Sequence, residues 1–171
     1  MVSSRLREPR GSVLFVCTGN ICRSPIAETV FRALLKRERL EHRIAVDSAG
    51  THDYQLGQPP DARAIAAARR RGYELVRRKA RMIDAQDFAR FDWILAMDRR
   101  NLAALAALRP AEYAGHVGLF LDFVPATEVR EVPDPYYGGI DGFEHVLDLA
   151  EQASEALLAE LRVKLRAPQT R

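Results

Sequence analysis

The run Val13-Leu14-Phe15-Val16 constrains the fold more than any other feature, because it is apolar at successive positions without a break. A strand with one solvated face alternates apolar and polar residues, whereas an unbroken apolar run is typical of a parallel strand that is buried on both faces. We therefore predict a central strand from Ser12 to Cys17, covered by helices on both sides.

Strand-like and helix-like segments alternate through the rest of the chain, which predicts an α/β layer structure. Further strands are expected at Arg43 to Ser48, Asp92 to Met97 and His116 to Phe120. Helices are expected at 24–40, 61–72 and 98–109, and from Asp141 onwards. The fold class is then a doubly wound, four-stranded parallel sheet with helices on both faces. In such folds ligands bind beyond the carboxyl ends of the strands, where the strand order reverses.

Short polar residues and glycine mark the expected helix ends. Ser24 and Pro25 are suited to be the N-cap and the first residue of the helix after the central strand. Asp61 can cap the start of the next helix, and Gly72 can end it.

The composition limits the class of protein. A chain of 171 residues fits one domain, and we expect a domain at 12–166 between a flexible N-terminal extension at 1–11 and a flexible tail at 167–171, because both ends are polar and aperiodic. No apolar run approaches the roughly 20 residues of a membrane span. The Arg-rich start lacks the apolar stretch of a signal peptide, so a cytoplasmic location is expected. The sequence leaves the oligomeric state open, and we favour a monomer.

The charge balance of the chain indicates which kinds of partner it can bind. The chain has 26 Lys and Arg against 23 Asp and Glu, a net charge of +3. This excess permits an anionic substrate but is well below that of a nucleic-acid-binding protein, so no nucleic acid is expected. The four histidines show no metal-ligand spacing with the two cysteines, and we expect neither a metal nor a cofactor.

The segment that follows the central strand is suited to bind an oxyanion. It reads Cys17-Thr18-Gly19-Asn20-Ile21-Cys22-Arg23-Ser24-Pro25. A turn from a buried strand into a helix collects unpaired backbone N–H groups at the positive end of the helix dipole. Gly19 and Asn20 tolerate the left-handed backbone angles that let these amides point inward. Arg23 adds a planar, permanently charged fork that can hold two phosphate oxygens.

Cys17 lies at the base of this turn. A helix N-terminus and a cationic neighbour favour the thiolate over the thiol, and a thiolate beside a bound phosphate can attack phosphorus. Ser24 could donate a hydrogen bond to this sulfur. The alternative is an inert core cysteine, which a lone Cys would favour; the surrounding Gly, Asn and Arg favour the nucleophile instead.

This segment resembles the phosphate-binding loop of the low-molecular-weight protein-tyrosine phosphatases, with its Cys-x5-Arg-Ser signature after an early strand. Further similar segments follow in order: 47–51, 57–61, 92–98 and 134–139. The resemblance implies a protein-tyrosine phosphatase that hydrolyses phosphotyrosine and small aryl phosphates through a phosphocysteine on Cys17. Arg23 and the loop amides then bind phosphate, with Thr18, Gly19, Asn20, Ile21, Cys22 and Ser24 forming or supporting the loop.

An aryl phosphate also needs a general acid to protonate its leaving oxygen. Asp134 is the best candidate, because Pro133 and Pro135 on either side stiffen the segment that presents it. An isolated Pro-Asp-Pro would be a solvated surface turn. The resemblance instead implies that Asp134 protonates the leaving group and then activates water.

The resemblance also suggests what surrounds the phosphate. We expect the pocket walls that contact the substrate to include Tyr54, Tyr136 and Tyr137. In the family, the two adjacent tyrosines that match Tyr136 and Tyr137 can both be phosphorylated. Ordinary loop packing is the alternative for Tyr54 and for the Tyr136–Tyr137 pair. Cys22 either fills space in the loop or forms a reversible disulfide with oxidised Cys17, and the resemblance supports this redox role.

One position departs from the family pattern. Many relatives carry a His shortly before the Ala80-Arg81 pair that helps to hold the loop Asn, and here Arg78 takes its place. An arginine can donate to the side-chain oxygen of Asn20 but cannot accept from its amide. The rigidity of the loop is therefore a question for the structure.

Two other functions remain as alternatives. Arsenate reduction on the same fold would use the same loop, but it needs further cysteines as an electron relay, and none follows Cys22. A non-catalytic phosphate-binding module would not need Cys17, Arg23 and a candidate acid together. The resemblance implies a phosphotyrosine protein as the partner and, if the source is bacterial, a tyrosine kinase among such partners.

Overall fold

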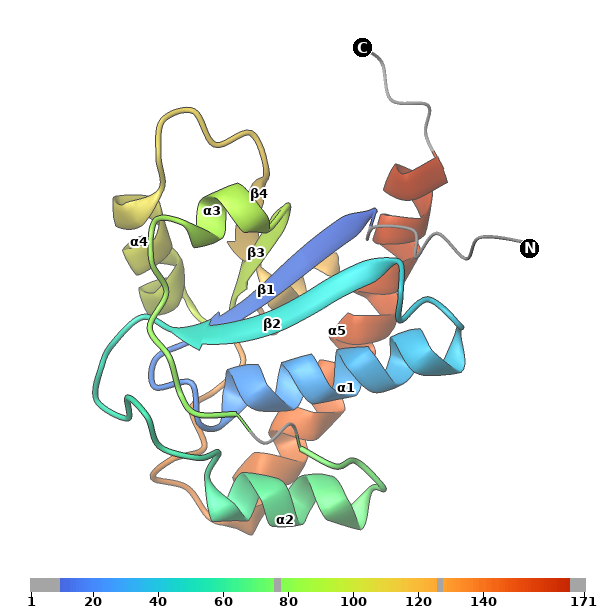
Figure 1. Ribbon diagram of the computed structural model, residues 1–171. Helices are drawn as coiled ribbons and strands as arrows, with labels where there is room; N and C mark the ends of the chain where they lie inside the picture. The colour runs from blue at the N-terminus through green and yellow to red at the C-terminus, as the bar shows by residue number, and fades with distance from the viewer. Residues whose placement is uncertain (1–9, 76–77, 126–127, 167–171) are drawn as a thin grey trace, which may run out of the picture.

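The computed structural model describes residues 10–75, 78–125 and 128–166 (Figure 1). Its centre is a four-stranded sheet in the order β2-β1-β3-β4, and every pair of neighbouring strands is parallel. The strands are β1 (Gly11–Cys17), β2 (Ile44–Gly50), β3 (Trp93–Ala96) and β4 (His116–Leu119). The predicted strands are all present, and the ends differ by one or two residues.

β1 has both faces buried, as its apolar run predicts. Val13 and Phe15 belong to a core that includes residues of α1 (Arg23–Arg37) and α5 (Ile140–Arg166). Leu14 and Val16 belong to a second core, with residues of α3 (Asp87–Arg90) and α4 (Arg99–Leu108). Successive strand residues point to opposite faces of a sheet, so one apolar run supplies both cores. Figure 1 shows the helices on both sides of the sheet.

The remaining elements are α2 (Ala62–Arg70), which packs on α5, and the 3₁₀ helix η1 (Phe120–Phe123) after β4. The sequence did not predict α3 and η1, because four residues are too few to show a helical period. Asp61 does cap α2, by accepting a hydrogen bond from the backbone N–H of Arg63 at 2.8 Å. Gly72 follows the C-cap of α2 at a φ of +83°, as expected for a glycine that ends a helix.

The predicted N-cap of α1 is wrong. The helix begins at Arg23, with Cys22 as N-cap and no side-chain cap. Ser24 lies inside the first turn, and its hydroxyl contacts the Cys17 sulfur and the Asn20 amide instead. The hydroxyl therefore serves the loop rather than the helix end.

The order of the strands places the candidate site. β1 has β2 on one side and β3 on the other, so the strand order reverses at β1, and the loops after β1 and β3 meet at the carboxyl edge of the sheet. Residues 1–9 and 167–171 of the two predicted flexible ends lie outside the described residues, whereas Gly11 begins β1. In the described part of the chain, no helix combines the length and hydropathy needed to cross a bilayer.

Candidate active site

The loop between β1 and α1 is fixed by backbone hydrogen bonds to the segment after β2. The N–H of Thr51 donates to the Cys17 carbonyl at 2.9 Å, and the N–H of His52 donates to the Thr18 carbonyl at 3.1 Å. The N–H of Asp61 donates to the Ile21 carbonyl at 2.8 Å. These three hydrogen bonds connect the carbonyl groups of the loop to the segment after β2 and so hold the backbone of the loop in place.

Asn20 holds the turn of this loop from behind. Its φ of +57° lies in the left-handed region, which a non-glycine residue adopts at a cost. Its side-chain amide donates to the hydroxyls of Ser24 at 2.9 Å and Ser48 at 3.0 Å, and its carbonyl accepts from the backbone N–H of Arg81 at 3.1 Å. These side-chain bonds stabilise the left-handed backbone.

Cys17 lies at the base of the loop and is 3% exposed, and its sulfur is 3.0 Å from the Ser24 hydroxyl oxygen. Because that oxygen accepts from Asn20, its own hydrogen is directed elsewhere. Two acceptors are in reach, the Cys17 sulfur and the Ala49 carbonyl at 3.3 Å. The Ser24 hydroxyl can therefore donate to a sulfur anion, as the sequence suggested.

The structure answers the question that Arg78 raised for the rigidity of the loop. Arg78 does not contact Asn20; its Nη1 donates to Asp47 Oδ1 at 2.6 Å. The side-chain carbonyl of Asn20 is held instead by the main-chain N–H of Arg81.

Arg23 is almost fully buried, at 2% side-chain exposure, and is held by several acceptors. Its Nη1 donates to Asp98 Oδ2 at 2.6 Å and to the Val132 carbonyl at 3.1 Å. Its Nη2 has longer contacts, 3.3 Å to the Thr18 hydroxyl and 3.5 Å to Asp134 Oδ2. Burial alone lowers the pKa of Arg23, but Cys17, Asp98 and Asp134 together raise it above its ordinary value. The guanidinium is therefore fixed in place and charged.

Asp134 reaches the same pocket from the segment before α5. Its Oδ1 accepts from the backbone N–H of Tyr136 at 3.0 Å, and its side chain is 47% exposed. The segment is tied to the sheet because the N–H of Val132 donates to the Met97 carbonyl at 2.8 Å. A carboxyl group that is anchored, yet open to solvent, can exchange protons with both a substrate and water.

These groups converge on one pocket of about 330 Å³. Its lining includes Cys17, Arg23 and Asp134, the three residues with predicted chemical roles. The other predicted residues that line it are Thr18, Gly19, Ile21, Cys22, Tyr54, Tyr136 and Tyr137. Asn20 and Ser24 lie behind the loop rather than on the pocket wall.

Comparisons with known proteins agree with this geometry. The family model of the low molecular weight phosphotyrosine protein phosphatases matches residues 12–167. A low molecular weight protein-tyrosine-phosphatase of Streptomyces coelicolor is 46% identical over 153 residues, which cover 88% of this chain and 93% of the relative. The chain belongs to the low molecular weight phosphotyrosine protein phosphatase family.

Solved structures show the same fold around the phosphatase loop. A protein tyrosine phosphatase from Entamoeba histolytica superposes with a TM-score of 0.86 at 40% identity, covering 90% of this chain and 98% of that one. An arginine phosphatase from Drosophila superposes with a TM-score of 0.81 at 34% identity, covering 88% and 97%. These matches confirm the predicted family, fold class and hydrolase class.

Asp98 and Asn101, which hold groups of this phosphatase site, were missed from the sequence. Asp98, the N-cap of α4, forms the 2.6 Å ion pair with Arg23. Asn101, which is 1% exposed, donates to the Thr18 hydroxyl at 3.1 Å. Their position directly after β3 could have identified them from the sequence, because the carboxyl end of β3 lies beside that of β1 in a parallel sheet.

Aromatic rings form the mouth of the phosphatase pocket. Tyr54 stacks on His52 with a centroid distance of 4.9 Å, and Tyr136 packs edge-on against Tyr137 at 4.9 Å. The guanidinium of Arg63 lies 5.5 Å from the Tyr136 ring centroid. The sequence analysis did not single out Gln55, which also lines the pocket. The mouth is therefore mainly aromatic, and the charged Arg23 lies below it.

Cys22 lines the pocket beside the nucleophile candidate, and neither cysteine is in a disulfide. Burial raises the pKa of Cys22 far above its ordinary range, and its interactions with Asp61, Cys17 and Asp134 act in the same direction. Cys22 is therefore a thiol at neutral pH. Among the described residues, no group of His, Cys, Asp or Glu is arranged to hold a metal ion.

Proposed function

We propose that this phosphatase hydrolyses phosphotyrosine in proteins through a phosphocysteine on Cys17. The observation that carries the proposal is the convergence of Cys17, Arg23 and Asp134 on one pocket of about 330 Å³. A nucleophile, a fixed cation and a proton donor are the groups that phosphate-ester cleavage requires.

In the first step, the Cys17 thiolate attacks phosphorus as the bond from phosphorus to the tyrosine oxygen breaks. The loop amides and Arg23 stabilise the charge on the phosphate oxygens. Asp134 in its acid form gives its proton to the departing oxygen, so that tyrosine leaves as a neutral phenol. The products are the free tyrosine side chain and a phosphocysteine.

In the second step, water attacks the phosphocysteine. Asp134, now a carboxylate, accepts a proton from the water as the new P–O bond forms and the S–P bond breaks. Phosphate leaves, and the thiolate is restored with help from the Ser24 hydroxyl, whose oxygen lies 3.0 Å from the sulfur. The same Asp134 thus donates in the first step and accepts in the second.

The shape of the pocket supports a phosphotyrosine substrate. Cys17 is 3% exposed at the base, so a phosphate must reach inward to contact it. A serine stem is too short to span the aromatic mouth, whereas a phenyl ring can pack against Tyr54 and Tyr136. A phosphoarginine side chain is also long, and a structural relative is an arginine phosphatase. The apolar Ile21 in the lining favours a neutral aromatic stem over a guanidino group.

The test compares turnover of phosphotyrosine, phosphoserine and phosphoarginine peptides of one sequence. Phosphotyrosine should have the highest kcat/KM, and the substitution Cys17→Ser should abolish turnover while circular dichroism stays unchanged. Acid quenching during turnover should trap phosphate on the wild-type chain but not on Cys17→Ser. Turnover by Cys17→Ser, or a preference for phosphoserine or phosphoarginine, would overturn the proposal.

We also propose that Cys22 protects the nucleophile from overoxidation. Peroxide oxidises the Cys17 thiolate to a sulfenic acid, and the Cys22 sulfur then attacks it to form a disulfide with loss of water. The raised pKa of Cys22 makes this second step slow, because the attacking group is a thiolate. Mass spectrometry of peroxide-treated protein should show the Cys17–Cys22 link, and sulfinic Cys17 without that link would contradict it.

A further inference from the structure

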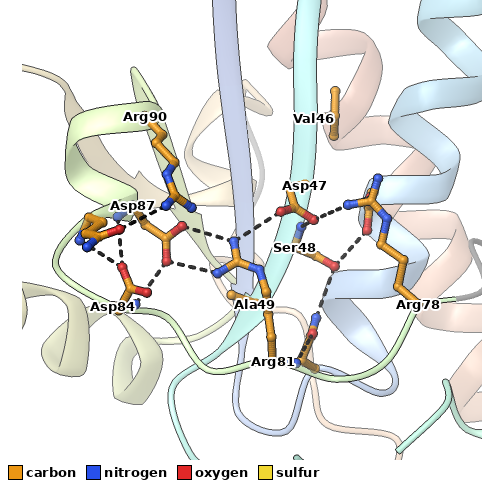
Figure 2. Close-up of polar contacts among 12 residues, drawn as sticks. Val46, Asp47, Ser48, Ala49, Arg78, Arg81, Asp84, Asp87 and Arg90 are labelled. Atoms are coloured by element: carbon orange, nitrogen blue, oxygen red, sulfur yellow. Dashed lines mark hydrogen bonds and ion pairs between the residues drawn. The ribbon is translucent and has the colours of Figure 1, made fainter. Parts of the chain in front are cut away.

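A segment with no role in the mechanism above runs along the back of the loop. Residues 78–84 lie beside the carboxyl end of β2 in space. There the N–H of Gly50 donates to the Arg81 carbonyl at 2.9 Å, and the N–H of Ile83 donates to the Gly50 carbonyl at 2.8 Å. We call this segment the strap. Figure 2 shows Arg81 of the strap lying between acidic side chains.

The guanidinium of Arg81 is clamped by two carboxylates. It donates to both oxygens of Asp87, at 3.0 and 3.1 Å, and to Asp47 Oδ2 at 3.1 Å. Asp87 is fully buried and also accepts from the N–H of Asp84 at 2.9 Å. Burial acts to lower the pKa of Arg81, but Asp87 and Asp47 outweigh it and raise the pKa. The clamp is therefore a charged, partly buried and geometrically defined contact.

The main chain of the same residue contacts the loop. The N–H of Arg81 donates to the Asn20 carbonyl oxygen at 3.1 Å, and the Asn20 amide donates to the Ser24 hydroxyl at 2.9 Å. That hydroxyl oxygen lies 3.0 Å from the Cys17 sulfur. A continuous series of hydrogen bonds therefore leads from the clamp to the candidate nucleophile.

We propose that Arg81 is a positioning residue for the phosphate-binding loop. Its guanidinium, held by Asp87 and Asp47, orients its own peptide N–H toward Asn20 and so keeps the left-handed turn and the Ser24 hydroxyl in place. This role rests on the proposed function, since it concerns the same nucleophile. Arg81 is not among the residues that line the pocket.

The need for the side chain follows from the burial of Asp87. Without the guanidinium, this fully buried carboxylate keeps the N–H of Asp84 as its partner but has no opposite charge, and an unpaired buried charge is strongly unfavourable. The strap and α3 then have to move to hydrate it. Movement of the strap displaces the Arg81 N–H that donates to the Asn20 side chain. The hydrogen bond from the Gly50 N–H holds only the carbonyl group of Arg81, so it does not prevent this displacement.

The test compares Arg81→Met with Arg71→Met. Arg71 serves as the control because its side chain is 25% exposed against 32% for Arg81. It is also held by carboxylates, Glu144 at 2.9 Å, Asp148 at 2.8 Å and Glu151 at 3.3 Å, but on the α2–α5 side. With p-nitrophenyl phosphate, Arg81→Met should lower kcat by about tenfold to hundredfold, the range expected for a small displacement of a reacting group. Arg71→Met should keep kcat within about twofold of the wild-type value, even if its melting temperature falls as much as that of Arg81→Met.

A double substitution tests the route. If Arg81 acts through Asn20, then Arg81→Met added to Asn20→Ala should cost little further activity, because both changes break one series of contacts. Arg81→Lys should restore part of kcat by returning the charge to Asp87. Equal losses from Arg81→Met and Arg71→Met, or fully multiplicative losses in the double variant, would overturn the proposal.

A readout without turnover separates this inference from the proposed function. In amide spectra recorded with and without inorganic phosphate, Arg81→Met should shift the N–H signals of 18–23, and Arg71→Met should leave them in place. If wild-type protein fails to cleave phosphotyrosine, the proposed function falls while the shifts still decide the role of Arg81. Unshifted loop signals in Arg81→Met would refute the positioning role.

Discussion

Gly50 offers the sharpest test of how closely the loop is packed. It is the last residue of β2 and pairs with Cys17, so its Cα faces the backbone of the phosphate-binding loop. A Cβ added at Gly50 would lie 2.7 Å from the Thr18 carbonyl oxygen and 3.2 Å from the Asn20 nitrogen. An ordinary contact begins at 3.4 Å, so the substitution Gly50→Ala forces a displacement of about 0.7 Å.

The displaced atoms cannot swing aside as a flexible side chain would. Thr18 is held by the hydrogen bond from the N–H of His52 at 3.1 Å, and the neighbouring Cys17 carbonyl is held by that of Thr51 at 2.9 Å. Overpacking against backbone typically costs about 1–3 kcal/mol of stability. A shift approaching 1 Å in a reacting group can lower the rate about hundredfold, so we expect kcat to fall about tenfold to hundredfold.

The assay is steady-state hydrolysis of p-nitrophenyl phosphate, with urea unfolding of the same samples. Gly11→Ala is the control, because Gly11 starts the same β1–β2 ladder at its other end and its Cβ would meet only Trp93 and Leu165, at 3.5 and 3.6 Å. This variant should keep both kcat and stability. A Gly50→Ala enzyme with wild-type kcat would show that the loop tolerates the displacement and refute the argument.

Further predictions concern charges and rings around the pocket. Asp98→Asn breaks the 2.6 Å ion pair with buried Arg23 and should cost about 3 kcal/mol in urea unfolding, with lower affinity for phosphate as an inhibitor; unchanged stability would contradict the pairing. Because the folded state raises the pKa of Cys22 above 9.0, the unfolded state releases its proton first as the pH rises, so stability is lost above about pH 9 at up to about 1.4 kcal/mol per pH unit. Cys22→Ala should show less of this alkaline loss, and an identical pH profile would refute the assignment. Arg63→Met removes the cation that lies 5.5 Å from the Tyr136 ring, and should raise KM for aryl phosphates up to about fivefold with kcat kept, as expected for about 1 kcal/mol; a selective fall in kcat would argue against a role in binding alone.

The prediction of α1 shows where sequence reasoning fails locally. Ser24 has the residue type of an N-cap and precedes a proline, so the helix was expected to begin after it. In the structure the helix begins at Arg23, and the hydroxyl of Ser24 contacts Cys17 and Asn20. The single hydroxyl of Ser24 is used in contacts with Cys17 and Asn20, so it does not cap the helix.

Arg78 shows a different failure. Its sequence position suggested a contact with Asn20, but its side chain donates to Asp47 at 2.6 Å. The contact comes from the main chain three residues later, at Arg81. Main-chain donors carry no residue signature, so a sequence pattern cannot identify them.

The sequence by itself determined the strand, the loop and the helix around Cys17, because each depends on neighbours within a few positions. An unbroken apolar run gives a strand with two buried faces, and Gly19 and Asn20 permit the turn that follows. The spacing from Cys17 to Arg23 then places a sulfur and a guanidinium on one loop, and the later segments identify the family.

Only the tertiary structure decided what holds these groups in position. Arg23 meets Asp98 across 75 positions, and Asn20 meets the N–H of Arg81 across 61. Residue type and periodicity report burial and local backbone conformation, but they do not say which distant carboxylate or peptide group a folded chain brings to a given atom. The packing of β1 between β2 and β3 makes that choice, because it sets the loops after all three strands side by side.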